Sequence, residues 1–422
     1  MLGRAAFLAS LALAPRIAAA QGQPLGPEFR VNTFTTGDQT APSRASVAAD
    51  GSGNFVVVWE SDGQDASSNG LFAQRYDASG APLGLEFRVN TFTTGDQSWG
   101  AVAADPSGNF IAVWQGNLQD GSGYGVFGQR YASTGIPLGA EFRVNTFTTG
   151  DQRHPFVNAA PSGDFLVVWH SNGQDGSLYG IFGQRYSSSG APLGPEFRAN
   201  TYTTQAQGFP TAASDSSGNF VVTWRSFNQP PDSFSYGVFG QRYDSSGAPL
   251  GGEFPINTHT TSGQGRPSVA ADPSGNFIVV WSSYQQDGVP GSGVYGQRYA
   301  ASGAPLGAEF RVNTYTTNLQ YGASVAADAA GNFVVAWMSV QDGSAYGVYG
   351  QRYTASGAPT GPEFRVNTFT TGFQGYPSVA SDPAGDFVVV WQGSLQDGSA
   401  YGMFGQRFGR IVPVELMRLR VE

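Results

Sequence analysis

Seven times along the chain a threonine-rich segment ends in a glutamine, and the residues just after this glutamine are where the copies differ most. Most of the divergent residues are aromatic or cationic. They are Trp99, Arg153, His154, Phe209, Arg266, Tyr321 and Tyr376, with Arg44 after a longer segment in the first copy. Aromatic rings and guanidinium groups on a rigid frame bind flat, hydroxyl-rich or anionic ligands. We therefore take these residues as candidate ligand-binding residues, with neutral variation at exposed loop tips as the alternative.

Acidic loops offer a second kind of chemistry. They hold the weak calcium candidates Asp65, Asp120, Asp175, Asp287, Asp342 and Asp397, several of them in Gln-Asp-Gly-Ser. Calcium takes roughly six to eight oxygen ligands, whereas each loop supplies one or two acids. An aspartate side chain also caps tight turns. Turn capping is therefore the simpler interpretation, and calcium is the one cofactor that the sequence leaves open.

No group in the sequence has the setting of a catalytic residue. The three histidines, at positions 154, 170 and 259, do not have the spacing of zinc ligands. A glutamate and an arginine recur in every repeat, for example Glu141 and Arg130, and we expect them to pair across neighbouring strands. A residue that is copied in every repeat is a poor candidate for a unique acid or base. The sequence therefore favours a binding protein over an enzyme.

The elements that position these residues recur with a tryptophan. The repeated residues are Trp59, Trp114, Trp169, Trp224, Trp281, Trp337 and Trp391, spaced 55, 55, 55, 57, 56 and 54 residues apart. Each repeat, best seen over residues 101–145, contains four short strand-like runs separated by Gly- and Pro-containing turns, with no helical period. This pattern predicts an all-β fold, a seven-bladed β-propeller with four antiparallel strands per blade, over residues 21–409.

The lengths of the links predict the order of the strands. Three connections in each unit are compact, and the threonine-rich link is the longest, so we expect the small-residue strand (101–104) innermost and the Glu-Phe-Arg strand (141–145) outermost. The last repeat has no outer strand after residue 408. Residues 28–33 should supply it and close the ring, with residues 410–416 as the rival donor. The candidate binding residues then ring the mouth of a central channel.

Composition suggests an exported protein. Residues 1–20 have the charged start, short apolar run and small-residue end of a signal peptide, and no later segment is long and apolar enough to span a bilayer. Without these 20 residues the chain of 422 keeps 20 arginines against 31 acids, a net charge of −11. This charge disfavours nucleic acid as a partner. We expect a monomer that is secreted, periplasmic, extracellular or at the cell surface; residues 410–422 form a tail outside the repeat.

The repeat unit resembles a known type of repeat. Its Gln-Asp-Gly-Ser, Gly-Gln-Arg-Tyr and Glu-Phe-Arg-Val-Asn-Thr motifs, across residues 24–408, are similar to those of exported or surface-displayed bacterial repeat proteins, most of which have no assigned activity. The resemblance implies an exported propeller and assigns no catalytic residue. We expect a binding module for a glycan or a protein at the channel mouth. The alternatives are a repeat scaffold without a small ligand, and a hydrolase or lyase that uses the Pro-rich insertion at residues 228–232.

Overall fold

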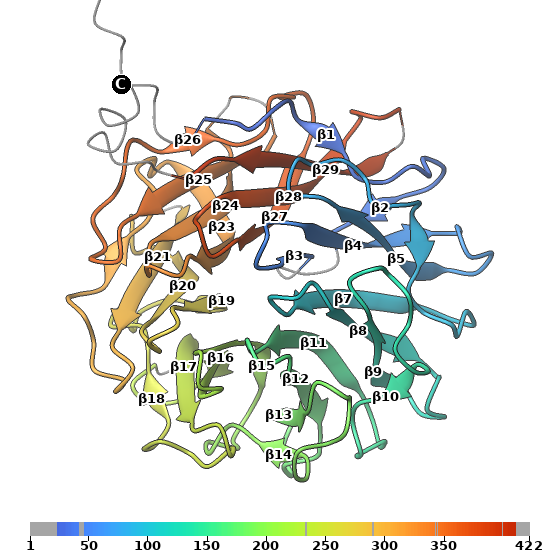
Figure 1. Ribbon diagram of the computed structural model, residues 1–422. Helices are drawn as coiled ribbons and strands as arrows, with labels where there is room; N and C mark the ends of the chain where they lie inside the picture. The colour runs from blue at the N-terminus through green and yellow to red at the C-terminus, as the bar shows by residue number, and fades with distance from the viewer. Residues whose placement is uncertain are drawn as a thin grey trace, which may run out of the picture.

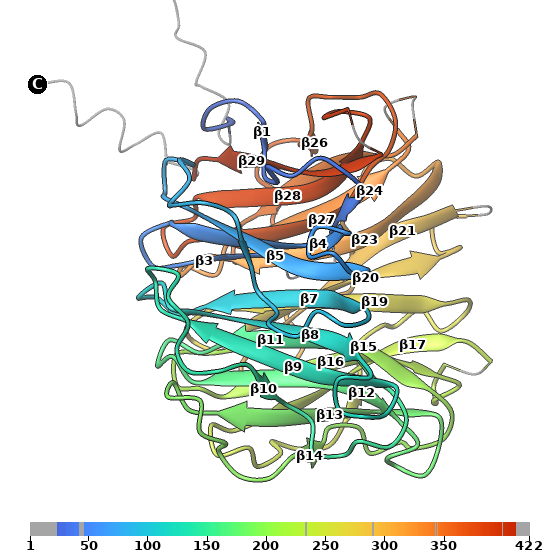
Figure 2. The ribbon, with the colours of Figure 1, turned by 90° about the vertical axis from the view of Figure 1, so that its right-hand side faces the viewer.

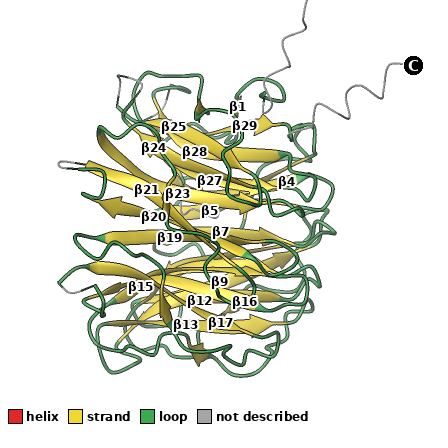
Figure 3. Ribbon diagram, turned by 90° about the vertical axis from the view of Figure 1, so that its left-hand side faces the viewer, coloured by secondary structure: helices red, strands yellow, loops and turns green. Residues whose placement is uncertain are grey.

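Short alternating segments between tight turns form every element of the fold. The computed structural model describes residues 23–41, 46–232, 234–288, 291–341, 343, 345–398 and 400–410, so the expected signal peptide, Arg44, Asp342 and residues 411–422 lie outside the described part. The described residues form strands and turns, without a helix (Figure 3). Accordingly, this part of the chain contains no helix that could cross a membrane.

The strands group into four-stranded antiparallel units that we call blades. The inner strands are β3 (Val47–Ala49), β7 (Gln97–Ala104), β11 (Gln152–Ala159), β15 (Gln207–Ser214), β19 (Gln264–Ala271), β23 (Asn318–Ala327) and β27 (Gln374–Ser381). The second strands are β4 (Phe55–Asp62), β8 (Phe110–Asn117), β12 (Phe165–Asn172), β16 (Phe220–Phe227), β20 (Phe277–Tyr284), β24 (Phe333–Ser339) and β28 (Phe387–Ser394). In the first blade, β2 (Gln39–Thr40) also pairs with β4.

The third strands are β5 (Asn69–Tyr76), β9 (Tyr124–Tyr131), β13 (Tyr179–Tyr186), β17 (Tyr236–Tyr243), β21 (Gly291–Tyr299), β25 (Gly347–Tyr353) and β29 (Tyr401–Phe408). The outer strands are β6 (Phe87–Arg88), β10 (Phe142–Arg143), β14 (Phe197–Arg198), β18 (Phe254–Pro255), β22 (Phe310–Arg311), β26 (Phe364–Arg365) and β1 (Phe29–Arg30). Figure 1 shows the blades around a central opening, with β7, β11, β15 and β19 nearest to it. The predicted all-β propeller with four antiparallel strands per blade, and the strand order within each blade, are confirmed. A short parallel pairing of β21 with β23 joins two neighbouring blades into one eight-stranded sheet.

The N-terminal strand completes the last blade. β1 pairs antiparallel with β29, placing Phe29 opposite Gly405 and Arg30 opposite Phe404. This pairing confirms the predicted closure. Because β1 and β28 occupy the two edges of β29, neither edge is free for the alternative donor, residues 410–416. One core cluster also crosses the junction, because Trp59 of the first blade packs with Val390 of the last.

The hydrophobic core lies between neighbouring sheets, which stand side by side around the ring (Figure 2). All seven repeated tryptophans are 0% exposed, and each belongs to a cluster that draws residues from two successive blades. A large aromatic side chain buries about 150–250 Å², or about 4–6 kcal/mol gross before chain entropy is subtracted. Contact between blades therefore holds the ring together.

The repeated glutamate joins blades, which corrects the expected Glu–Arg pairing within one blade. Glu141 Oε2 accepts hydrogen bonds from the Thr91 backbone N–H at 2.6 Å and the Thr91 hydroxyl at 2.8 Å, and its other oxygen accepts from Gln119. The other six glutamates that do the same are Glu28, Glu86, Glu196, Glu253, Glu309 and Glu363. Glu28 reaches Thr368, so this belt also crosses the ring junction.

The repeated arginine forms a separate belt. Arg130 donates to the carbonyl oxygens of Ser188 and Ser189 in the next blade. The equivalent bonds come from Arg75, Arg185, Arg242, Arg298, Arg352 and Arg407. The strand register explains why glutamate and arginine do not meet: Phe142 lies opposite Gly128, so Glu141 falls opposite Gln129 rather than Arg130.

Candidate binding site at the mouth of the central channel

A β-bulge interrupts each inner strand from β7 onward, two residues after the repeated glutamine. In β7 the register shifts between Ser98 and Ala101, which adds one residue relative to the second strand. The residue at the bulge has a positive φ: 54° at Trp99, 51° at His154, 56° at Phe209, 56° at Arg266, 70° at Gly322 and 54° at Tyr376. We expected the divergent residues in the links that precede the inner strands. Instead they lie within the strands, because the inner strands begin at the glutamine.

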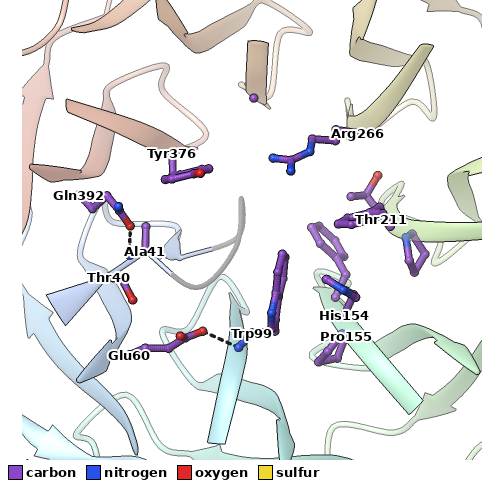
Figure 4. Close-up of a pocket in the computed structure, with 14 residues that line it drawn as sticks. Thr40, Ala41, Glu60, Trp99, His154, Pro155, Thr211, Arg266, Tyr376 and Gln392 are labelled. Atoms are coloured by element: carbon purple, nitrogen blue, oxygen red, sulfur yellow. Dashed lines mark hydrogen bonds between the residues drawn. The ribbon is translucent and has the colours of Figure 1, made fainter. Parts of the chain in front are cut away.

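The bulges aim their side chains into one cavity. Its volume is about 330 Å³, and its lining includes Trp99, His154, Phe209, Arg266, Gly322 and Tyr376. Each of these residues comes from a different blade, and Figure 4 shows the side chains of Trp99, His154, Arg266 and Tyr376 around the channel mouth. Phe156 also lines the cavity, where the equivalent residue of the other blades is small (Ser46, Ala101, Thr211, Ser268, Ser324 or Ser378). The structure thus brings together five of the seven predicted site residues.

Aromatic rings form one wall of the cavity. The ring centroids of Trp99 and His154 are 3.7 Å apart in an edge-on contact, and those of His154 and Phe209 are 4.4 Å apart. Trp99 also meets Phe209 edge-on at 6.0 Å. Tyr376 stands in another part of the mouth and keeps 39% of its surface exposed. These mutual contacts fix the rings before any ligand arrives, which lowers the entropy cost of binding.

A second set of variable residues supports the bulges. It occupies the position after the tryptophan of each second strand: Glu60, Gln115, His170, Arg225, Ser282, Met338 and Gln392. The bulge backbone N–H donates to the side chain of the preceding blade: Trp99 N to Glu60 at 2.5 Å, His154 N to Gln115 at 3.1 Å and Gly322 N to Ser282 at 3.1 Å. Sequence reasoning missed these residues because they adjoin a core tryptophan. Their variation inside a nearly constant strand is the signal that could have revealed them.

The cavity is electrically uneven. Burial raises the pKa of Glu60 to about 8; the nearby Asp96 adds to this shift, and the hydrogen bond from the Trp99 N–H acts against it. The Glu60 carboxyl is therefore largely protonated at neutral pH. Burial, with Arg153, Arg225 and Arg266 nearby, lowers the pKa of His154 to about 3. Burial lowers the pKa of His170 as well. Both histidines are therefore neutral, and the positive charge at this wall comes from arginine.

Arg153 and Tyr321 do not line the cavity. Arg153 forms an ion pair with Asp151 at 2.9 Å and lies over the ring of Tyr124 at 4.1 Å. Tyr321 packs edge-on against Tyr346 with 5.6 Å between ring centroids. Both residues directly precede a bulge residue, and successive side chains of a strand point to opposite faces. The bulge residue of the blade that contains Tyr321 is Gly322.

The acidic loops act as turn caps. Asp65, Asp120 and Asp175 each accept a hydrogen bond from the backbone N–H two residues later, at 3.1 to 3.2 Å. Asp287 accepts from Asn313 at 3.2 Å, and Asn32 donates to Asp397 at 3.4 Å. The described residues contain no group of three or more potential metal-binding side chains. Calcium binding stays an untested prediction.

The Pro-rich insertion has a structural role at its acidic residue. Asp232 is 0% exposed and accepts a hydrogen bond from Asn257 at 2.9 Å. Asp175 and Asp287 contact the equivalent asparagines, Asn200 and Asn313. Among the described residues that line the cavity, Glu60 alone carries a carboxyl group.

The comparisons with known proteins support the fold. No protein-family model matches the sequence, and neither does any curated protein. The structure is similar to a protein of unknown function from Dyadobacter fermentans, with 10% identity, 75% of this chain and 95% of that chain covered, and a TM-score of 0.53. It is also similar to the β-propeller domain of the Trilobed protease from Pyrococcus furiosus, with 9% identity, 90% and 97% covered, and a TM-score of 0.52.

A weaker similarity links the chain to an α-L-arabinanase from Penicillium chrysogenum complexed with arabinobiose, with 15% identity, 72% and 92% of the two chains covered, and a TM-score of 0.47. At these identities the similarities identify the architecture and leave ligand and activity open. The similarity to the β-propeller domain of the Trilobed protease, with a TM-score of 0.52, supports the propeller fold of this chain.

Proposed function

We propose that this protein is an exported monomeric binding module that holds a glycan residue in the cavity at the channel mouth. The observation that carries the proposal is a contrast within the repeat. The glutamate and arginine belts between blades, the hydrophobic core and the turns are nearly the same in every blade. In contrast, the bulge positions carry different side chains that all point into one cavity: Trp99, His154, Phe209, Arg266 and Tyr376. Bulky residues with positive φ are uncommon and point to a functional demand.

The chemistry of the wall favours a sugar. Sugar rings present a flat face of C–H groups, which packs on aromatic side chains, and a rim of hydroxyls, which hydrogen-bond to polar groups. The cavity offers Trp99 and Tyr376 as aromatic surfaces and Arg266, Thr211 and Gln392 as polar partners. Its volume of about 330 Å³ lies at the small end of ligand sites. It therefore suits one or two sugar rings better than a folded protein surface.

A glycan-array screen of the mature protein, with and without calcium, tests the proposal. We expect saturable binding that falls at least tenfold in Trp99→Ala and Tyr376→Ala, a loss of about 1.4 kcal/mol or more. Tyr321→Ala is the matched control, since this aromatic residue lies beside a bulge but outside the cavity, and should bind as wild type. An array without binding in both conditions would argue for a protein-binding scaffold. Binding that depends on calcium would direct attention back to the acidic loops.

A further inference from the structure

Two arginines at the cavity lack acidic partners. Arg266 lines the cavity, and its guanidinium lies 5.8 Å from the ring centroid of Phe209. Arg225 lies over the same ring at 4.3 Å and over the ring of Tyr236 at 4.3 Å. Among the described residues, neither guanidinium has a hydrogen bond or an ion pair, and the two ion pairs found involve Arg153 and Arg311. In contrast, the arginine belt donates to backbone carbonyls around the whole ring.

Partial burial distinguishes these two arginines, because the other described arginines without a guanidinium hydrogen bond or ion pair, Arg30, Arg365 and Arg410, are exposed. The chain has 31 acidic residues for 22 basic ones, so a carboxylate partner could have been placed nearby. A guanidinium has five N–H donors, and those of Arg225 and Arg266 have no protein acceptor among the described residues that would compete with a ligand. Both residues are half-buried. An anionic ligand group would supply the missing acceptors, because a carboxylate or a sulfate accepts two parallel bonds from one guanidinium.

The side of the cavity that faces Arg266 would not repel an anion, because its one described carboxyl group is largely uncharged. Figure 4 shows Arg266 pointing toward the centre of the cavity, with Glu60 on the far side. Glu60 accepts the Trp99 N–H at 2.5 Å, and its pKa of about 8 leaves it largely uncharged at neutral pH. His154 and His170 are neutral as well. Among the described residues that line the cavity, the charge is therefore positive on one side and close to zero on the other.

We propose that the cavity selects an anionic sugar residue, whose carboxylate or sulfate group binds the guanidinium of Arg266 while its ring packs against Trp99. This inference rests on the proposed glycan-binding function and narrows its ligand class. Arg225 adds positive potential from behind Phe209 without direct contact with the ligand. The bidentate geometry is specific to arginine, so a lysine in place of Arg266 should restore only part of the affinity.

The test is isothermal titration with matched pairs of sugars. The probes are methyl glucuronide and methyl galacturonide, their neutral counterparts methyl glucoside and methyl galactoside, and galactose 6-sulfate. We expect the acidic sugars to bind at least tenfold more tightly than the neutral ones, and this preference to disappear in Arg266→Gln. Arg266→Lys should lie between the two. The control is Arg365→Gln, which removes the same charge at an exposed position on the outer strand β26.

The outcomes separate this inference from the proposed function. Equal binding of neutral and acidic sugars, lost in Trp99→Ala but unchanged in Arg266→Gln, would retain glycan binding and overturn the anionic preference. A lack of binding by every probe would refute both proposals for these sugars. Binding of galactose 6-sulfate without binding of either uronide would identify the anion as a sulfate. Thermal unfolding of each variant checks that the loss of binding does not come from loss of the fold.

Discussion

The φ of 56° at Arg266 predicts an unusual order of stability between two substitutions. A Cβ atom in the left-handed region costs about 1–2 kcal/mol, a cost that glycine avoids. At an ordinary position alanine is more stable than glycine by about 0.4–1 kcal/mol, because glycine loses more freedom on folding. The first effect exceeds the second by about 0.5–1 kcal/mol. Arg266→Gly should therefore be more stable than Arg266→Ala, and both variants lack the same side-chain contacts.

A difference of this size needs amplification in a chain this long, where 1 kcal/mol shifts Tm by only about 1 °C. Five bulge residues have φ between 51° and 56°: Trp99, His154, Phe209, Arg266 and Tyr376. Replacing all five with glycine or all five with alanine should separate the two proteins by about 3–5 kcal/mol, or roughly 3–5 °C in Tm. Differential scanning calorimetry measures this separation directly.

The control pair is Tyr321→Gly and Tyr321→Ala. Tyr321 adjoins the bulge of its blade, but the positive φ falls on Gly322, so alanine should be the more stable replacement there. If the alanine set matched or exceeded the glycine set at the five bulges, the positive φ would carry no strain. The argument that the strands hold strained residues in order to aim them into the cavity would then be wrong.

Two further predictions concern the acid and the ring junction. Because the folded state raises the pKa of Glu60 from 4.5 to about 8, wild type should lose stability relative to Glu60→Gln as pH rises between these values, by at most about 1.4 kcal/mol per pH unit. Urea denaturation at pH 4.5, 6 and 8 measures the difference, and a constant difference would refute the raised pKa. Deletion of residues 21–33 should lower Tm, because it removes β1 and the hydrogen bond between Glu28 and Thr368 across the ring junction. Truncation after Arg410 is the control, and an unchanged transition after the N-terminal deletion would contradict closure by β1.

The fold was predictable because its signals repeat. The tryptophans marked one buried strand per blade, and the long threonine-rich link indicated where an outer strand crosses to the next inner one. Closure followed from the missing outer strand after residue 408. The pairing of Glu141 was not predictable in this way, because hairpin neighbours were assumed to share a register. The observed register places Glu141 opposite Gln129, and its partner, Thr91, lies 50 residues away in another blade.

The site was only partly predictable from sequence. Position relative to the repeated glutamine identified Trp99 and Arg266, but it could not tell which of two successive residues points into the cavity, so Arg153 and Tyr321 were included. The extra residue of a bulge changes the alternation of a strand, and this cannot be counted from the sequence alone. Glu60 was missed for a different reason. Its position follows a core tryptophan, and only the variation of this position among the seven repeats, rather than the polar residue itself, could have indicated a role in the next blade.

The geometry of the bulges does not depend on the side chains that they carry. Tryptophan, histidine, phenylalanine, arginine and tyrosine occupy the same position with φ values within 5° of one another, so the surrounding backbone imposes the conformation. The anchor is the glutamine two residues earlier, which is 0% exposed in every blade. In the third blade its side chain accepts from Asn145 at 3.1 Å and donates to the Thr149 carbonyl at 3.1 Å. This glutamine and the glutamate and arginine belts between blades lie apart from the cavity. The bulge residues that line the cavity can therefore change while the ring keeps its structure. Under the proposed function, binding specificity and stability thus depend on different residues of the same repeat.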